Sequence, residues 1–230
     1  MTGKFNKLIA LTVLLAAPAF SFAQKKQTPT GKAYFSTGID GYLLSTTLRQ
    51  KAGESMTFST PRFTAFLHLG LNVNYDFNKN IGLFTGINVK NIGFIEKFDA
   101  PDSTVKRRVY TFGIPLAVKL GNVKYGKYLM LGGGIDFPFN YKEKGFVKRN
   151  DKAKFNEWFS SRTPAAMPYV FIGAHIPLMA VKLQFYPANF MNNSYTTLDA
   201  NGNKYSPYAN YDVQLAMLTL GFDITYKPKE

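Results

Sequence analysis

The sequence predicts an all-β fold, an eight-stranded antiparallel up-and-down transmembrane β-barrel of an exported protein. Three observations lead to this prediction. An export signal opens the chain, long segments alternate apolar and polar residues with a period of two, and the links between those segments alternate between short and long. Together they indicate a chain that leaves the cytoplasm and crosses a membrane as strands.

The first residues have the three parts of a secretory signal peptide. Lys4 and Lys7 precede an apolar run that ends at Phe20, and the small residues Ser21 and Ala23 follow. The run is shorter than the roughly 20 residues of a membrane-spanning helix, so we expect cleavage after Ala23. The expected organisation is a signal peptide over 1–23, a short periplasmic lead over 24–32, the barrel over 33–226 and a C-terminal tail over 227–230.

Composition narrows the compartment and the partners. The chain has no Cys and a formal net charge of +14. Without Cys it can form neither disulfides nor a thiolate metal site, and no lipoprotein anchor is available. The positive charge favours polyanions such as lipid phosphates and acidic polysaccharides, and export argues against nucleic acid. We therefore expect localisation in a bacterial outer membrane, among lipid and lipopolysaccharide.

The clearest alternation covers residues 62–77, where one face is apolar over the whole length. Strands of soluble sheets average about 5–6 residues, whereas tilted membrane strands need about 9–11, so the length favours a membrane. Eight strands are expected, at 33–44, 62–77, 81–95, 109–120, 129–141, 168–176, 181–190 and 218–226. Two of them contain irregularities. Pro115 lacks an N–H, which predicts a bulge or break, and the apolar parity shifts near Asn91, which predicts a bulge.

The links between these strands sort by length. The short links are 78–80, 121–127 and 177–180, and the long links are approximately 45–61, 98–108, 142–167 and 191–210. Outer-membrane barrels join their strands by short periplasmic turns and longer outer loops, so this sorting supports the same fold.

The face opposite the apolar one would line the lumen. An eight-stranded lumen is just filled by side chains, and buried charges must pair because an unpaired one is costly. We therefore expect a polar, plugged interior rather than a solute pore. The predicted lumen network comprises Asp40, Arg62, His68, Asp76, Lys90, Lys119, Asp136, His175, Lys182 and Asp223.

The 142–167 link is the most basic one, and its stretch 153–159 is expected to form a helical turn. One interpretation is a cationic, aromatic surface that binds lipopolysaccharide phosphates or a cell-surface ligand. The other is a solvated loop that balances an anionic outer leaflet. The candidate polyanion-binding residues are Lys142, Lys144, Lys148, Arg149, Lys152, Lys154, Trp158 and Arg162.

No catalytic, cofactor-binding or metal residues are expected. His68 and His175 are the only histidines, too few for a multi-His site. A lipid-modifying enzyme would need a His beside an activated Ser at the outer lipid boundary. Because His68 lies mid-strand and His175 lies near a periplasmic turn, we expect both to form core hydrogen bonds. Within the glycine run at 132–134, small residues would relieve crowding inside a strand.

The segment 110–120, in which Ile114-Pro115-Leu116 is followed by apolar residues and Lys119, resembles a strand of the PorT-type outer-membrane β-barrel family. A looser resemblance extends over 34–226. It implies an outer-membrane barrel without catalytic residues, in a family with members linked to protein secretion. The leading hypothesis is a structural or interaction barrel, related to secretion or adhesion, with envelope or secretion proteins as further partners. A lipid-A-modifying enzyme and a soluble periplasmic lipocalin-like carrier stay open as alternatives.

Overall fold

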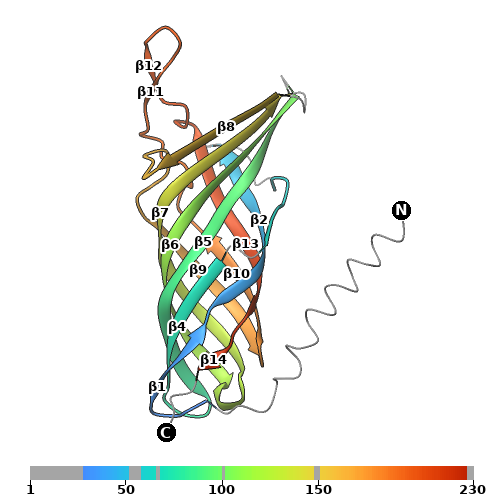
Figure 1. Ribbon diagram of the computed structural model, residues 1–230, viewed down its shortest axis with the longest axis vertical. Coiled ribbons are helices and arrows are strands. Elements are labelled where there is room, and N and C mark those ends of the chain that lie inside the picture. The colour runs from blue at the N-terminus through green and yellow to red at the C-terminus, as the bar shows by residue number, and fades with distance from the viewer. Residues whose placement is uncertain (1–27, 52–57, 66–67, 100–101, 148–150, 227–230) are drawn as a thin grey trace, which may run out of the picture.

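The computed structural model describes residues 28–51, 58–65, 68–99, 102–147 and 151–226, which form a tall antiparallel sheet curved around a buried core (Figure 1). The predicted signal peptide, most of the predicted lead and the tail lie outside the described residues. None of the helices within those ranges is long and apolar enough to cross a membrane. The strands are β1 Ala33–Thr37, β2 Ile39–Lys51, β3 Arg62–Ala65, β4 His68–Asp76, β5 Ile81–Asp99, β6 Asp102–Asn122, β7 Lys127–Val147, β8 Asp151–Trp158, β9 Met167–Ile176, β10 Met179–Tyr186, β11 Thr197–Leu198, β12 Lys204–Tyr205, β13 Tyr211–Phe222 and β14 Thr225–Tyr226, with one 3-10 turn, η1 Val123–Tyr125.

The main sheet has the order β14-β1-β4-β5-β6-β7-β9-β10-β13-β2-β3, with β8 attached to β7. All these pairings are antiparallel, which confirms the predicted all-β antiparallel class. The described residues contain fourteen strands rather than the predicted eight. The difference arises partly at short breaks, such as Gly38 between β1 and β2. The first two strands lie beside the last two strands, because Phe35 on β1 is opposite Tyr226 on β14 and Leu44 on β2 is opposite Leu218 on β13.

Several strands extend further than the alternation predicted. The expected loop at 98–108 is mostly strand, because β5 ends at Asp99 and β6 begins at Asp102. In the expected loop at 142–167, residues 159–166 do lie outside strands, but the part before them is a hairpin in which β8 pairs with the end of β7. The helical turn predicted over 153–159 is therefore wrong. We call β8, the part of β7 that pairs with it (140–147), and the adjoining parts of β6 (102–110) and β5 (91–99) the ribbon. The ribbon lies at the upper end of Figure 1. An antiparallel strand can carry charged side chains on one face when that face is in contact with water.

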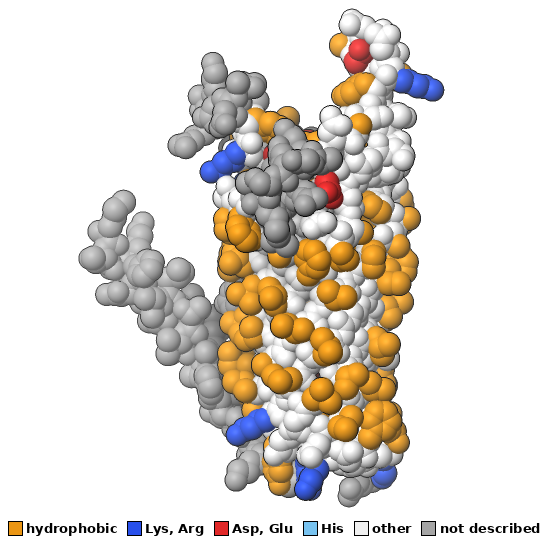
Figure 2. Space-filling model, turned by 180° about the vertical axis from the view of Figure 1, so that it is seen from behind, with side chains coloured by type: hydrophobic (Ala, Val, Ile, Leu, Met, Phe, Trp, Pro, Cys, Tyr) orange, Lys and Arg blue, Asp and Glu red, His pale blue; other side chains and the backbone are white. Residues whose placement is uncertain are grey.

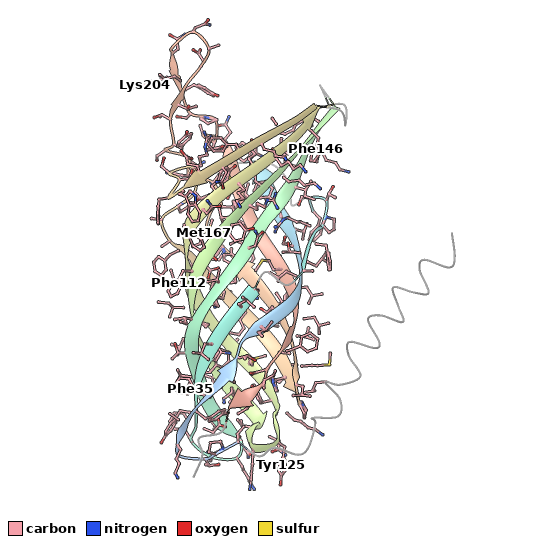
Figure 3. All side chains as sticks on the ribbon, in the orientation of Figure 1. Phe35, Phe112, Tyr125, Phe146, Met167 and Lys204 are labelled. Atoms are coloured by element: carbon pink, nitrogen blue, oxygen red, sulfur yellow. The ribbon has the colours of Figure 1, made fainter. Side chains whose placement is uncertain are left out.

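Along most of the sheet, apolar side chains point outward and polar ones point inward. Leu69 and Leu131 have exposed fractions of 59% and 60%, whereas Lys119 and Asp136 are fully buried. Figure 2 shows hydrophobic side chains spread over the wall, and Figure 3 shows the ring of Phe112 pointing away from it. A lipocalin-like carrier would need the reverse polarity, so that alternative is wrong for this chain.

The ladder break predicted at Pro115 is present, whereas the bulge predicted near Asn91 is absent. The β5–β6 ladder skips two pairs beside Pro115 but resumes in the same register, and it passes Asn91 without a shift. The missing N–H of proline therefore costs ladder bonds without displacing the strand. A shift does occur between β6 and β7, where Tyr110 is opposite Asn140 and Thr111 is opposite Pro138. The extra residue is Phe139, so the bulge is in β7.

Candidate functional site

Ion pairs inside the sheet connect strands that are far apart in sequence. Lys119 on β6 lies 2.5 Å from the Asp76 carboxylate on β4 and donates to the Tyr34 hydroxyl at 2.9 Å and to Asn74 at 3.1 Å. Tyr34 in turn donates to Asp76 at 2.8 Å. All of these side chains are buried. A buried charge with several hydrogen-bonding partners holds its strands in one register.

A second cluster surrounds Lys90 on β5. Its ammonium lies 2.9 Å from the Asp136 carboxylate and donates to the Tyr186 hydroxyl at 3.1 Å. Tyr186 donates to the same carboxylate at 2.6 Å, and the ammonium lies 3.8 Å from the centre of the Tyr169 ring. The cation therefore has a carboxylate, a hydroxyl and an aromatic face as partners.

The remaining predicted lumen residues also contact one another or the backbone. Asp40 pairs with His68 and, at 2.8 Å, with Lys182. His175 lies 3.6 Å from Asp223 and 2.7 Å from the Gly126 carbonyl. Arg62 instead bonds the side chain and carbonyl of Asn91. The structure thus brings the predicted network residues to the interior as separate clusters, rather than as one chain of contacts.

The space among these clusters is small. A cavity of about 50 Å³ lies between Asp40, His68, Lys90, His175 and their neighbours. Pockets that bind small molecules usually enclose about 300–1,000 Å³, so this cavity has room for a few waters and no more.

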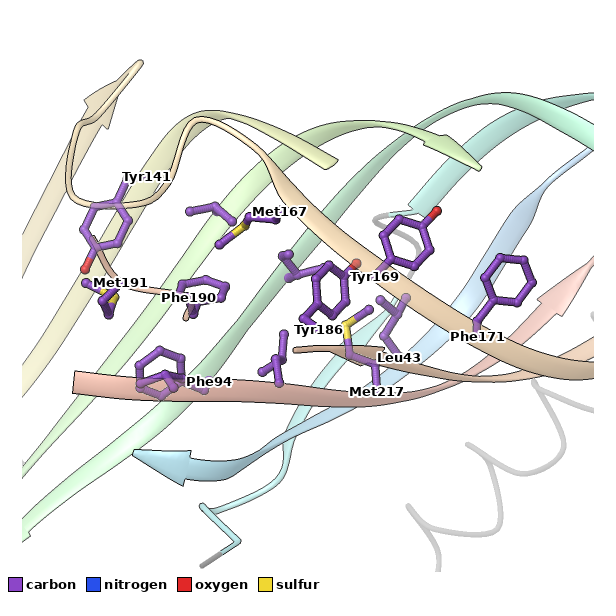
Figure 4. Close-up of a cluster of buried hydrophobic side chains, with 14 of the residues drawn as sticks. Leu43, Phe94, Tyr141, Met167, Tyr169, Phe171, Tyr186, Phe190, Met191 and Met217 are labelled. Atoms are coloured by element: carbon purple, nitrogen blue, oxygen red, sulfur yellow. The ribbon is translucent and has the colours of Figure 1, made fainter. Parts of the chain in front are cut away.

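Above the ion pairs the interior becomes apolar, which the sequence did not predict. Figure 4 shows Tyr141, Met167, Phe190 and Met191 gathered from β7, β9 and the 187–210 connection. The rings of Phe94 and Phe190 meet edge to face at 5.4 Å. The parity shift seen near Asn91 in the sequence therefore marks a change in what the strands enclose, not a bulge.

On the outward side of the sheet, the side chains change from apolar below to basic on the ribbon. Residues opposite one another in a ladder share a face. Lys106 is opposite Lys144, which is opposite Lys154, and Arg108 is opposite Lys142. Lys97 shares this face by strand alternation. Lys106 and Lys144 both lie over the Phe146 ring, at 5.7 and 4.8 Å, which confirms their common side. We call this surface the basic face, comprising Lys97, Lys106, Arg108, Lys142, Lys144 and Lys154.

Three glutamates of the ribbon lie on its other side. Glu96 and Glu143 both pair with Arg107, and Glu143 also accepts from the Tyr141 hydroxyl at 2.6 Å. Glu157 pairs with Arg162 at 3.3 Å. These three carboxylates are therefore held among inward-facing partners, away from the basic face.

The predicted polyanion-binding residues separate into groups. Lys142, Lys144 and Lys154 are on the basic face, Trp158 lies at its base, and Lys152 is on β8 opposite Phe146. Lys148 and Arg149 lie outside the described residues. The sequence reasoning missed Lys97, Lys106 and Arg108, because it placed most of this stretch in a loop. The alternation of Lys106, Arg108, Tyr110 and Phe112 would have extended the strand through them.

Arg162 is not part of the basic face. Its guanidinium lies 4.6 Å from the rings of both Phe155 and Tyr195, and it donates to the Tyr208 hydroxyl at 3.1 Å. Burial lowers the pKa of Arg162, but the bond to Tyr208 and the nearby Tyr195 and Glu157 more than offset this, so the pKa is raised. Arg162 therefore contacts both β8 and the 187–210 connection at the upper end of the sheet.

Comparison with known proteins gives one family match. A family described as "Outer membrane protein beta-barrel domain" matches residues 22–229. No curated protein matches the chain. Among solved structures, the chain resembles Ail, the attachment invasion locus protein of Yersinia pestis, in complex with the heparin analogue sucrose octasulfate, with 14% identity, 85% of this chain and 100% of that chain covered, and a TM-score of 0.38. A second Ail structure has 15% identity, the same coverage and a TM-score of 0.32. At such TM-scores the likeness carries no argument about a ligand here.

Proposed function

Since the chain belongs to the outer membrane protein β-barrel domain family, we propose that it is an eight-stranded outer-membrane barrel of structural or interaction type. Its lumen is plugged, and its basic face binds polyanions outside the membrane. The narrower PorT-type membership, a link to secretion or adhesion, and cleavage of a signal peptide after Ala23 stay predictions.

The count of eight follows if strands separated by short breaks are joined. Three of the eight barrel strands are then composite: β1 with β2, β3 with β4, and β13 with β14. The other five are β5, β6, β7, β9 and β10. The pairings of β1 with β14 and of β2 with β13 support this grouping, because the last composite strand then pairs with the first one in both of its parts. Eight is the smallest number usual for outer-membrane barrels.

The plugged lumen is supported by both halves of the interior. Lys119 and Lys90 bond carboxylates and tyrosines below, and Phe94, Phe190 and Met191 fill the space above. A non-conducting barrel with no catalytic role fits these contacts best, since both histidines face carboxylates inside the wall. In planar bilayers we expect no stepwise conductance from the purified protein, and steady single-channel currents would overturn the plug.

The basic face carries the binding proposal. Cations from four neighbouring strands share one surface, while Glu96, Glu143 and Glu157 of the same ribbon pair with arginines on its other side. Such a surface attracts phosphate- or sulfate-bearing polymers, and the attraction weakens with salt. The ribbon also stands beyond the apolar band, where a polymer outside the membrane could reach it (Figures 1 and 2).

A soluble probe tests this binding. We expect the triple variant Lys106→Gln, Lys144→Gln and Lys154→Gln to bind inorganic polyphosphate about tenfold more weakly at low salt, and the difference should shrink at about 1 M salt. The matched control is Lys79→Gln, Lys124→Gln and Lys127→Gln, which removes the same charge from the opposite end. Equal affinities of the two triple variants would contradict the proposal.

A further inference from the structure

At the base of the basic face, the β7 bulge gathers polar and aromatic side chains on the outside of the sheet. Tyr110 is opposite Asn140, which is opposite Trp158, and one step higher Arg108 is opposite Lys142. Because Tyr141 points into the core, its neighbour Asn140 points outward. The extra residue Phe139 lies on the same side, since its ring stacks on Trp158 at 6.0 Å and meets Tyr110 at 6.3 Å.

This arrangement leaves polar groups buried without partners. Asn140 is 2% exposed, yet neither its amide nitrogen nor its amide oxygen has a hydrogen-bond partner among the described residues. The Nε of Arg108, one ladder step away, is buried and unpartnered in the same way. An unsatisfied buried polar atom is costly, so two such groups side by side indicate a site that a polar ligand completes.

The surroundings specify the charge of that ligand. Arg108 brings a full positive charge, and Lys142 holds its ammonium 4.9 Å from the centre of the Tyr110 ring, so both cations stand beside the Asn140 amide. Glu143, the nearest acid along β7, is bonded to Arg107 and Tyr141 on the inner side. Two cations with N–H donors, faced by no carboxylate among the described side chains, fit a phosphate group.

The position specifies where that phosphate comes from. Directly below the site, Phe112 is opposite Phe137, and both rings are exposed on the apolar wall. Trp158 is 62% exposed at the same level. Tyr and Trp at such a level typically lie at the boundary between lipid tails and headgroups. A phosphate bonded to Arg108 and Lys142 would therefore have apolar wall immediately beneath it for acyl chains.

We infer that Arg108, Asn140 and Lys142 bind the phosphate of an outer-leaflet lipid, the lipid A part of lipopolysaccharide, with its acyl chains along Phe112 and Phe137. This site rests on the proposed barrel and its basic face but differs from general polyanion binding, because it requires phosphate and acyl chain together. The barrel would thereby carry a fixed annular lipid at the ribbon base.

The experiment uses Trp158, the single tryptophan of the chain, as the reporter. The full protein in phosphatidylcholine nanodiscs is titrated with diphosphoryl lipid A, and the tryptophan fluorescence is followed. We expect saturable binding that weakens roughly tenfold or more in the double variant Arg108→Gln and Lys142→Gln. Asn140→Asp, which keeps the side-chain size and adds a negative charge, should weaken binding similarly. Lys204→Gln, on the distant β11–β12 hairpin, is the control and should bind as the parent does.

The arms separate the two proposals. Equal binding of dephosphorylated lipid A would overturn the phosphate site, as would equal binding by the double variant when it still shows a heat-dependent gel shift typical of a folded barrel. Inorganic phosphate alone should not compete at millimolar concentration, and full competition would overturn the lipid source. If polyphosphate binds to the basic face but lipid A does not bind, this site fails and the proposed function stands. If neither binds, both fail.

Discussion

Lys90 and Asp136 form an ion pair inside the sheet, with their charged atoms 2.9 Å apart and both side chains almost completely buried. Tyr186 bonds both partners, donating to the carboxylate and accepting from the ammonium. The pair joins β5 to β7, which are separated in the sheet by β6. The net stabilisation of such a pair is modest, but each partner makes the other tolerable in a dry environment.

Replacing one partner of this pair should therefore be worse than replacing both. We expect Lys90→Met to lower the free energy of unfolding by about 3–5 kcal/mol, because Asp136 is left buried and uncompensated. The double variant Lys90→Met and Asp136→Leu should recover most of that loss. Urea unfolding in lipid vesicles measures both, with the exposed Lys204→Met as control. A double variant as unstable as the single one would show that the pair is not the cause.

A methyl group at Gly134 should destabilise the barrel. An added Cβ there would lie 2.7 Å from the Tyr169 ring, the same ring that faces Lys90. Because that ring is packed on both sides, we expect Gly134→Ala to cost about 1–3 kcal/mol. Gly145→Ala on the same strand is the matched control, since nothing lies within 4 Å of its Cβ position. Similar unfolding midpoints in urea for the two variants would contradict this account.

The change of polarity along β5 predicts where the membrane ends. Ile87 is outward-facing and 50% exposed within the apolar band, whereas Ile95 is opposite Lys106 on the ribbon. We expect Ile87→Lys to cost about 2–4 kcal/mol and Ile95→Lys no more than about 1 kcal/mol, because only the first lysine would sit in hydrocarbon. Unfolding in vesicles compares the two. A larger cost at Ile95 would mean that the ribbon, too, is immersed in lipid.

The stability of the β11–β12 hairpin should depend on the ionisation of Asp199. Its carboxylate accepts the backbone N–H groups of Asn203 and Asn201, both at 2.8 Å, and the bond from Asn203 is the main cause of a pKa below the ordinary value of 3.8. Because the pKa is lower in the ordered hairpin than in the disordered one, the ionised carboxylate stabilises the hairpin. This stabilisation is fully present above pH 3.8 and is lost as the pH falls through the lower pKa of the ordered state.

Amide chemical shifts of Asn201 and Asn203, followed by NMR from pH 6 to pH 2, measure this transition. Asp199→Asn keeps an acceptor oxygen but cannot ionise, so its hairpin should show no transition in that range. A midpoint at or above pH 3.8 in the parent protein would contradict the prediction.

The sequence by itself determined which side of each membrane strand faces outward. A period of two is a local property, so the exposed Leu69 and the buried Lys119 follow from alternation without knowledge of the partner strand. The inward position of Asp40, His68 and Asp136 follows in the same way, because a charge cannot stay on a lipid-facing side. Their exact pairings could not be predicted, since they depend on contacts across the interior.

Only the tertiary structure decided where this polarity reverses and what the reversal creates. Ile92 and Phe94 face inward on β5, while Arg108 and Lys142 face outward on β6 and β7. The apolar upper interior and the basic face therefore arise at the same height. The sequence shows this only as a parity shift near Asn91, which a bulge would also produce. The Phe139 bulge and the row Arg108, Lys142 exist only through the pairing of β6 with β7, and cross-strand neighbours are determined by register rather than by local alternation.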